Sequence, residues 1–350
     1  MGDTHPETSS ILAVFGAASI LPESLDYAAA ITPPATHVMN GMPNYTLWWV
    51  RNLHDWYFHT GDLAYLRRHA DYLRTVMPRI AKAVKADGTQ TWGGFLDWPS
   101  QHNHAAQISG TCGLVATTLE NAAFLAHELK DAETERVCTE ALARIRRGKP
   151  EFAGSKQAAA LLALSGLRDP KEAYAEVLGR DGLKGVSTFY GYYMLEAMSA
   201  AGENQHALDT VRDYWGAMLD VGATSFWEDF NVAWTNNCFR LDEMPVPGKK
   251  DVHGDYGEFC YPGYRHSLCH GWSSGPAAWL IHHVLGARIT GVGGAEVTVN
   301  PFLGTLDWAE GALATPKGPV KIRVEKGADG KLKTKIDAPA GVRIVEGVRP

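Results

Sequence analysis

The chain has 350 residues, of which 45% are hydrophobic and 21% charged, and its formal net charge is -6. This length and composition fit one large globular domain plus a small one. A negative net charge without a run of lysine or arginine excludes a field that would gather nucleic acid or dock an anionic membrane, so a neutral or cationic partner is expected.

The N-terminal residues carry no export signal. Met1 is followed by Asp3 and Glu7 rather than by a basic segment and an apolar core, and no stretch reaches the roughly 20 apolar residues of a membrane span. A cytoplasmic location is therefore the default expectation for this chain, while an upstream signal would send a longer parent protein out of the cell.

From residue 8 to residue 285 the apolar residues mostly follow helical spacing, and the predicted helices come in consecutive pairs. The clearest pair covers residues 45–57 and 63–80, with Gly61 as the C-cap of the first helix and Asp62 as the N-cap of the second. Further pairs are predicted at residues 105–130 with 132–147, 156–166 with 170–179, and 188–201 with 204–219, followed by a last helix at 272–285. The tryptophans at 48, 49 and 56 lie on one helical stripe, which predicts that they are core residues.

After Gly286 the period changes from helical to alternating. The alternation predicts strands around residues 297–299, 320–324 and 332–336, with a hairpin turn at 328–330 between the last two. Paired helices followed by a β module predict a mainly α toroid over residues 1–286 and a small β-sandwich domain over residues 287–350.

The loops between the predicted helices are rich in tryptophan, glycine, histidine and acids. The three richest are TWGGFLDWPSQHNH (91–104), FWEDFNVAWTNN (226–237) and HGDYGEFCYPGYRHSLCHGWSSGP (253–276). Aromatic faces stack on the C–H faces of sugar rings, while carboxylates, amides and imidazoles hydrogen-bond sugar hydroxyls. If the helices form a ring, these loops meet at one cleft that suits a carbohydrate.

Glu228 is the acid that most resembles a catalytic group. It lies beside Asp229 between Trp227 and Phe230, with no lysine or arginine nearby in the sequence. Glycosidic bond cleavage needs one carboxyl that donates a proton and one that activates water, and apolar neighbours such as Trp227 raise a carboxyl pKa by desolvation. The residues alone leave open whether Glu228 is this group or a solvated loop acid.

Other residues in these loops also have two interpretations. Trp98 is either a ligand platform or a packed loop residue, and His270 is either a substrate donor or a capping or core histidine. A run containing Asp251, His253 and Glu258 resembles a set of metal ligands, but its spacing fits no calcium loop. The five cysteines are odd in number and lack a CxxC pair, which predicts reduced thiols. Neither a metal nor a cofactor is expected.

Six segments together point to a known family. They are MGDTHPET, MNGMPNYTLWWVRNLHDWYFHTGD, FLDWPS, RDYWGAMLDVGATSFWEDF, YRHSLCHGWSSGPAAWLIHHVLG and VNPFLGTLDWAEGALATPKGPV. In this order, over nearly the whole chain, they resemble the bacterial α-L-rhamnosidases, six-hairpin glycosidases with an (α/α)6 barrel and a C-terminal β-sandwich. The resemblance implies an inverting hydrolase of terminal α-L-rhamnosides.

The resemblance also implies roles for individual residues. Glu228 matches the glutamate that activates water as general base, and His270 matches a histidine that binds substrate hydroxyls. Asp97 and Trp98 match a loop that lines the same pocket. Asp3 matches the aspartate that closes the family's D-G-x-x-R-[DE]-R-x-x-W-x-G-D motif and is expected to belong to the catalytic site. The remaining substrate-binding residues expected are Trp227 and Trp272.

The sequence departs from the family pattern at its start. The general-acid carboxylate would lie about seven positions before Asp3, ahead of residue 1, and the family's first barrel helix would lie there too. A barrel without that helix is expected to expose apolar surface. Two alternatives stay open: another six-hairpin sugar hydrolase, since pocket loops and not the fold decide specificity, and a non-catalytic carbohydrate-binding or structural remnant.

Overall fold

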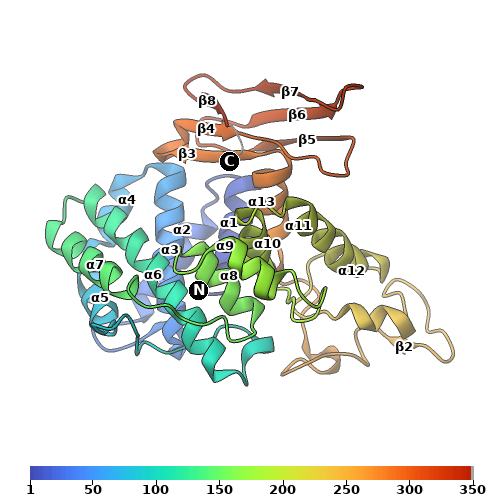
Figure 1. Cartoon of the computed structure of the whole chain (residues 1–350), viewed down its shortest axis with the longest axis horizontal. Coiled ribbons are helices and arrows are strands. Elements are labelled where there is room, and N and C mark those ends of the chain that lie inside the picture. The colour runs from blue at the N-terminus through green and yellow to red at the C-terminus, as the bar shows by residue number, and fades with distance from the viewer. Residues whose placement is uncertain (348–350) are drawn as a thin grey trace.

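A computed structural model describes residues 1–347 of the protein, which form a mainly helical body with small β-sheets towards the C-terminal end (Figure 1). The α-helices are α1 (Thr4–Val14), α2 (Ile20–Ile31), α3 (Pro43–Thr60), α4 (Leu63–Arg68), α5 (Ala70–Lys82), α6 (His104–Glu128), α7 (Ala132–Ile145), α8 (Lys156–Leu164), α9 (Pro170–Ala173), α10 (Gly191–Ala200), α11 (Asn204–Thr210), α12 (Gly216–Asp220) and α13 (Gly275–Trp279). Over residues 1–347, no helix combines the length and the apolar character that crossing a bilayer requires.

Six of these helices contact one another in a cycle. Helix α1 contacts α3, and the contacts continue through α6, α8, α10 and α13 back to α1. The intervening helices pack against members of the cycle: α2 on α3, α5 and α7 on α6, α9 on α8, and α11 on α10. The side chains that these contacts bury form one continuous apolar core.

Helix α3 shows why the sequence folds this way. Pro43 occupies its first turn, and the chain leaves it at Gly61, whose φ of 68° is left-handed. Trp48 and Trp49 on its apolar stripe are fully buried, as the helical spacing predicts. The Asp62 side chain then accepts a hydrogen bond from the backbone N–H of residue 65 at 2.9 Å, which confirms the predicted cap of the following helix.

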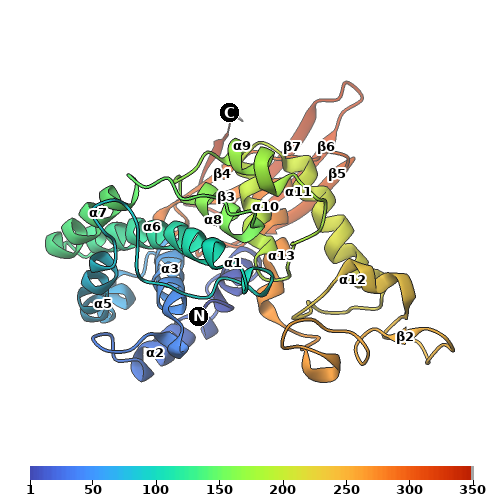
Figure 2. The same cartoon turned by 60° about the horizontal axis from the view of Figure 1, so that its bottom comes forward.

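Several predicted helices are less regular than their apolar spacing suggests. Residues 174–178, 211–215 and 280–284 are π-helical turns that continue α9, α11 and α13. Between α12 and α13 the chain runs for about fifty residues as an irregular segment with two short parallel strands, β1 (Cys238–Phe239) and β2 (Lys250–Asp251). This segment extends to one side of the helical body (Figures 1 and 2) and carries two of the three aromatic-rich loops.

The C-terminal part contains two three-stranded sheets. One has the order β3 (Ala287–Gly291), β4 (Glu296–Val299), β8 (Arg343–Glu346), and the other has the order β5 (Trp308–Leu313), β6 (Val320–Lys326), β7 (Leu332–Asp337). The three predicted strands correspond to β4, β6 and β7, and the turn at 328–330 joins an antiparallel pair. Strands β3, β5 and β8 were not predicted, since their burial does not follow a clean alternation.

Gly286 joins the helices to the sheets. Its φ is 69°, and a Cβ at this position would come within 2.1 to 2.4 Å of the backbone of Asn300 and Pro301. Only glycine fits a left-handed position pressed against another backbone. The change of period after Gly286 thus coincides with a sharp turn of the chain into β3.

The surface of α1 and α2 retains exposed apolar side chains. Phe15, just after α1, is 78% exposed, and Ile20, Tyr27 and Ile31 on α2 are each more than half exposed. Large apolar side chains are thus exposed on both of the first two helices.

Candidate active site

A cavity of about 430 Å³ lies where the three aromatic-rich loops meet. Asp97 and Trp98 come from the first loop, Glu228 from the second, and Tyr261 and Trp272 from the third. Residues 183–188, which the sequence did not mark, complete the wall. Four predicted site residues, Asp97, Trp98, Glu228 and Trp272, therefore line one cavity although they are up to 175 positions apart in the chain.

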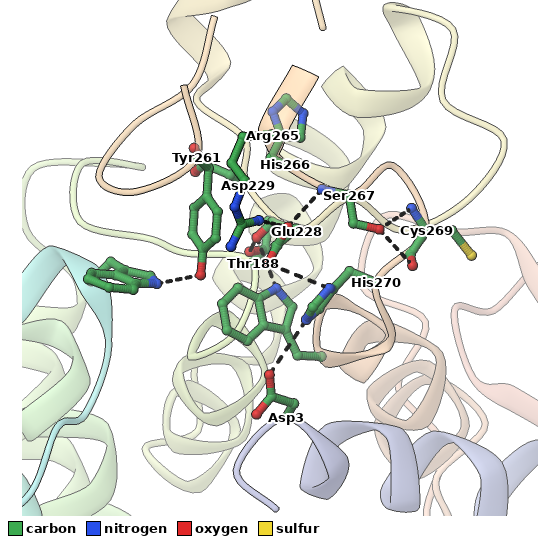
Figure 3. A network of polar contacts seen from close by, with 12 residues as sticks. Asp3, Thr188, Glu228, Asp229, Tyr261, Arg265, His266, Ser267, Cys269 and His270 are labelled. Carbon is green, nitrogen blue, oxygen red and sulfur yellow. Dashed lines mark hydrogen bonds and ion pairs between the residues drawn. The ribbon is translucent and has the colours of Figure 1, made fainter. Parts of the chain in front are cut away.

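Glu228 is held from both its backbone and its side chain. Its N–H donates to the Ser267 carbonyl at 2.8 Å, and its Oε2 accepts from the Ser267 N–H at 2.7 Å. Its carbonyl accepts from the Thr188 hydroxyl at 2.6 Å and from the Trp272 indole N–H at 2.9 Å. Only 7% of the residue is exposed. The carboxylate therefore has a single well-defined direction (Figure 3).

His270 lies between two carboxylates (Figure 3). Its Nδ1 is 3.8 Å from Glu228 Oε1, and its Nε2 is 3.6 Å from Asp3 Oδ1. The imidazole is positioned by a backbone hydrogen bond to the Phe226 carbonyl at 2.7 Å and by edge-on contact with the Trp272 ring at 4.5 Å. The histidine thus connects the predicted base on the second loop with the start of α1.

The two carboxylates are separated by about one imidazole ring and its contacts. The His270 ring occupies the space between the facing oxygens of Glu228 and Asp3, so the imidazole links the two carboxylates.

Asp3 is an ionised carboxylate at neutral pH. Burial opposes its ionisation, but the contacts from His270 and from the Tyr45 hydroxyl, which donates to Oδ2 at 2.6 Å, lower the pKa of Asp3 to about 2. Neither Asp3 nor His270 lines the cavity itself. His270 contacts Glu228, which lines the cavity, and Asp3 contacts His270.

A cation lies near Glu228 in space, although no lysine or arginine lies near it in the sequence. Arg265 Nη1 is 3.7 Å from Glu228 Oε2, and its guanidinium covers the Tyr261 ring at 5.2 Å from the ring centre. The two residues are distant in sequence, so the local pattern around Glu228 contained no signal for this contact. Arg265 and the Ser267 N–H thus place a positive charge and a hydrogen-bond donor beside the Glu228 carboxylate.

Two other carboxyls of the cavity are disposed towards protonation. Burial raises the pKa of Asp97 to about 6, although hydrogen bonds from the Ser187 hydroxyl and the Trp98 N–H favour its ionised form. Burial, assisted by the neighbouring Glu258 charge, also raises the pKa of Asp229 to about 6. A cavity that holds two acids of raised pKa beside Glu228 is suited to proton transfer.

The aromatic residues divide into two groups. Trp98 is half-buried, donates its indole N–H to the Tyr261 hydroxyl at 2.6 Å and stacks on Phe259 at 6.0 Å, so part of its surface faces the cavity. Trp272 stacks on Phe189 at 5.1 Å with nearly parallel planes. Trp227, which was expected to contact substrate, is instead 0% exposed and outside the cavity wall. It is buried in the apolar core, where its ring contacts the Phe230 ring edge-on.

Sequence reasoning missed several side chains that shape the site. Thr188 and Ser187 belong to a segment without any marked motif, so no local signal could identify them. Arg265 and Ser267 lie in the segment that contains His270, and Asp229 directly follows Glu228, so their proximity to predicted residues was the available signal. The acidic run at Asp251 forms a local turn, in which that side chain accepts from the N–H groups of residues 253 and 254.

Comparison with known proteins identifies the fold. No protein-family model and no curated protein matches the chain. Solved structures do match. A GH78 family rhamnosidase of Bacillus sp. GL1 superposes with a TM-score of 0.78 at 21% identity, over 99% of this chain and 38% of that one. The native α-L-rhamnosidase of Aspergillus terreus gives a TM-score of 0.74 at 15% identity, over 99% and 42%.

A third match is the Streptomyces avermitilis α-L-rhamnosidase complexed with L-rhamnose, with a TM-score of 0.73 at 16% identity, over 98% of this chain and 34% of that one. The chain thus spans less than half the length of each of these three proteins. Likeness at such low identity establishes the fold and not the activity. The chain therefore shares its fold with a part of these rhamnosidase structures.

Proposed function

We propose that the protein is a glycoside hydrolase of the α-L-rhamnosidase kind, which removes terminal α-L-rhamnosyl residues with inversion. The observation that carries the proposal is the placement of His270 between the carboxylates of Glu228 and Asp3 at the edge of an aromatic-lined cavity. The fold likeness to rhamnosidases, one of them holding L-rhamnose, supports the choice of sugar.

The architecture proposed for this enzyme is an (α/α)6 barrel over residues 1–286 followed by the β-sandwich domain predicted over residues 287–350, of which residues 348–350 lie outside the described part of the chain. Support comes from the cycle of six contacting helices, from the five helices that pack against them, and from the turn at Gly286. Within residues 1–347, the six helices of the cycle and the five packed against them are one helix fewer than six complete pairs. The loops that join the pairs on one side of the ring would then supply the substrate pocket.

In the proposed reaction Glu228 is the general base. Its carboxylate, which contacts Arg265 and the Ser267 N–H, removes a proton from water as that water attacks the anomeric carbon. His270 and Asp3 bind sugar hydroxyls. The resemblance assigns the general acid, which protonates the leaving oxygen, to a carboxylate outside residues 1–350.

The aromatic surfaces of the cavity would position the sugar ring for this attack. Trp98 and Trp272 offer indole faces, and Asp97 lies beside Trp98 where a hydroxyl can reach it. The C–H faces of the sugar ring gain contact area on these indole rings, while the sugar hydroxyls keep their hydrogen bonds at the cavity rim. Trp227 acts from below as a support for the loop that holds the base.

The test compares the wild-type chain with Glu228→Gln on aryl α-L-rhamnosides, with Glu151→Gln as the control at an exposed acid. Loss of the base is expected to lower the rate by about 10²- to 10⁴-fold, while the control keeps the wild-type rate. Proton NMR of the first-formed sugar is expected to show the inverted anomer. Equal rates for wild type and Glu228→Gln would reject the role of Glu228.

A series of leaving groups tests the position of the acid. If the acid is outside this chain, strongly activated aryl rhamnosides are cleaved while alkyl rhamnosides are not, because only a poor leaving group needs protonation. Cleavage of both with similar rates would place the acid within residues 1–350. Binding of L-rhamnose without cleavage of any substrate would favour the carbohydrate-binding alternative.

A further inference from the structure

A second cavity, of about 390 Å³, lies against the first sheet of the C-terminal part. Its wall comes from α1, α3, α10 and the π-turn at 280–284 and from β3, and it shares no residue with the wall of the proposed active site. In Figure 1 these elements meet below β3. The cavity has its own set of charged and hydrogen-bonding side chains.

Arg51 on α3 brings to this wall a positive charge that forms no ion pair with any carboxylate of residues 1–347. Its guanidinium covers the Trp48 ring at 5.0 Å, and its Nε is buried with no hydrogen-bond partner among residues 1–347. Asp55, one turn further along α3, does not neutralise it, since its oxygens contact His5 at 3.2 Å and His54 at 2.9 Å. A half-buried guanidinium with an unused N–H favours an anionic ligand.

The other charged side chains of the wall already have partners. Glu196 forms an ion pair with Arg288 at 2.9 Å and a second contact with His283 at 3.1 Å. The wall thus carries two carboxylates, Glu196 and Asp55, in addition to the Arg51 guanidinium. A doubly charged anion such as phosphate would be repelled by them, whereas a carboxylate with one negative charge would match Arg51.

His59 provides a hydrogen-bonding group that is also unused. It is 5% exposed and lines the cavity, and its Nε2 has no partner among the described residues. Burial lowers the pKa of His59 to about 4, so the imidazole is neutral at pH 7 and can bind a hydroxyl. Phe58 and Tyr192 add apolar surface to the same wall.

We propose that this second cavity binds a small hydroxylated monocarboxylate of the size of a sugar acid, with its carboxylate on Arg51 and a hydroxyl on His59. The cavity volume falls within the roughly 300 to 1,000 Å³ of small-molecule sites. The planar guanidinium offers two parallel N–H groups that match a carboxylate. The site is separate from the proposed active site, so this proposal does not depend on the hydrolase proposal.

The first experiment is calorimetric titration of the whole chain with D-glucuronate as the probe, with D-glucose and inorganic phosphate as comparisons. Glucuronate is expected to bind at least about tenfold more tightly than either comparison ligand, since only it supplies one carboxylate together with hydroxyls. Saturating L-rhamnose is expected to leave its affinity unchanged. Absence of binding, equal affinity for glucose or for phosphate, or displacement by L-rhamnose would overturn the proposal.

Variants then locate the binding. Arg51→Met keeps the apolar stem over Trp48 and is expected to weaken glucuronate binding by about tenfold or more, while Arg67→Met, at an exposed position on α4, is expected to bind as the wild type does. If Arg51→Met fails to fold by circular dichroism, Arg51→Lys replaces it, with a smaller but measurable loss because the charge stays and the paired N–H groups go. Wild-type affinity in the folded Arg51 variant would overturn the assignment.

Discussion

Asp97 makes the stability of the protein depend on pH in a direction opposite to that of an ordinary salt-bridged acid. Its pKa rises from 3.8 to about 6 on folding because the side chain is buried. Between those values the native state binds more protons than the unfolded state, so the free energy of unfolding falls as pH rises. A pKa change of this size corresponds to a loss of roughly 2 to 3 kcal/mol between pH 4 and pH 7.

The replacement Asp97→Asn removes this titration while keeping the shape of the side chain. Its amide loses part of the hydrogen bonding from Ser187 and Gln157, which adds a constant offset of about 1 kcal/mol that does not vary with pH. The wild type is therefore expected to lose roughly 2 to 3 kcal/mol relative to the variant as pH rises from 4 to 7. Groups common to both proteins cancel in this difference.

Urea denaturation at several pH values measures the effect directly. Asp213→Asn, at an exposed position of the π-helical turn 211–215, is the matched control and is expected to follow the wild-type curve. Parallel curves for wild type and Asp97→Asn across this range would refute the reasoning, because they would mean that burial does not hold a proton on the carboxyl.

Two further substitutions test the turn into the sheets and the support of the base. Gly286→Ala is expected to cost roughly 2 to 5 kcal/mol in urea denaturation, since it adds left-handed strain and a clash with facing backbone, whereas Gly216→Ala, at an open helical position, is expected to be neutral or stabilising. Thr188→Val removes the hydrogen bond from the Thr188 hydroxyl to the Glu228 carbonyl and is expected to lower kcat about tenfold. The control Thr117→Val in α6 is expected to keep the wild-type kcat. An unchanged kcat in both variants would contradict a positioning role for Thr188.

Much of the helical body could be predicted because its signals are local. The tryptophan stripe of α3, the left-handed Gly61 and the Asp62 cap all depend on residues within one or two turns of each other. The same holds for the turn at 328–330. Apolar periodicity, capping residues and turn residues act over short stretches of chain, so a single sequence carries them.

The details of the candidate site depended on contacts that no local pattern contains. Arg265 approaches Glu228 from 37 positions away, and Asp3 reaches His270 from the other end of the helical part. Trp227 shared the motif of Glu228 yet is fully buried in the core, where it packs against Phe230.

The sequence by itself determined the bounds of the regular elements, such as α3 and the turn at 328–330, and which of their faces are apolar, since these follow from steric and hydrophobic preferences of adjacent residues. Tertiary packing alone decided which charges became neighbours and where space was left unfilled. The ion pairs around His270 and the unpaired Arg51 in the second cavity both arise because distant helices and loops close on each other, and burial then fixes how each charge is compensated.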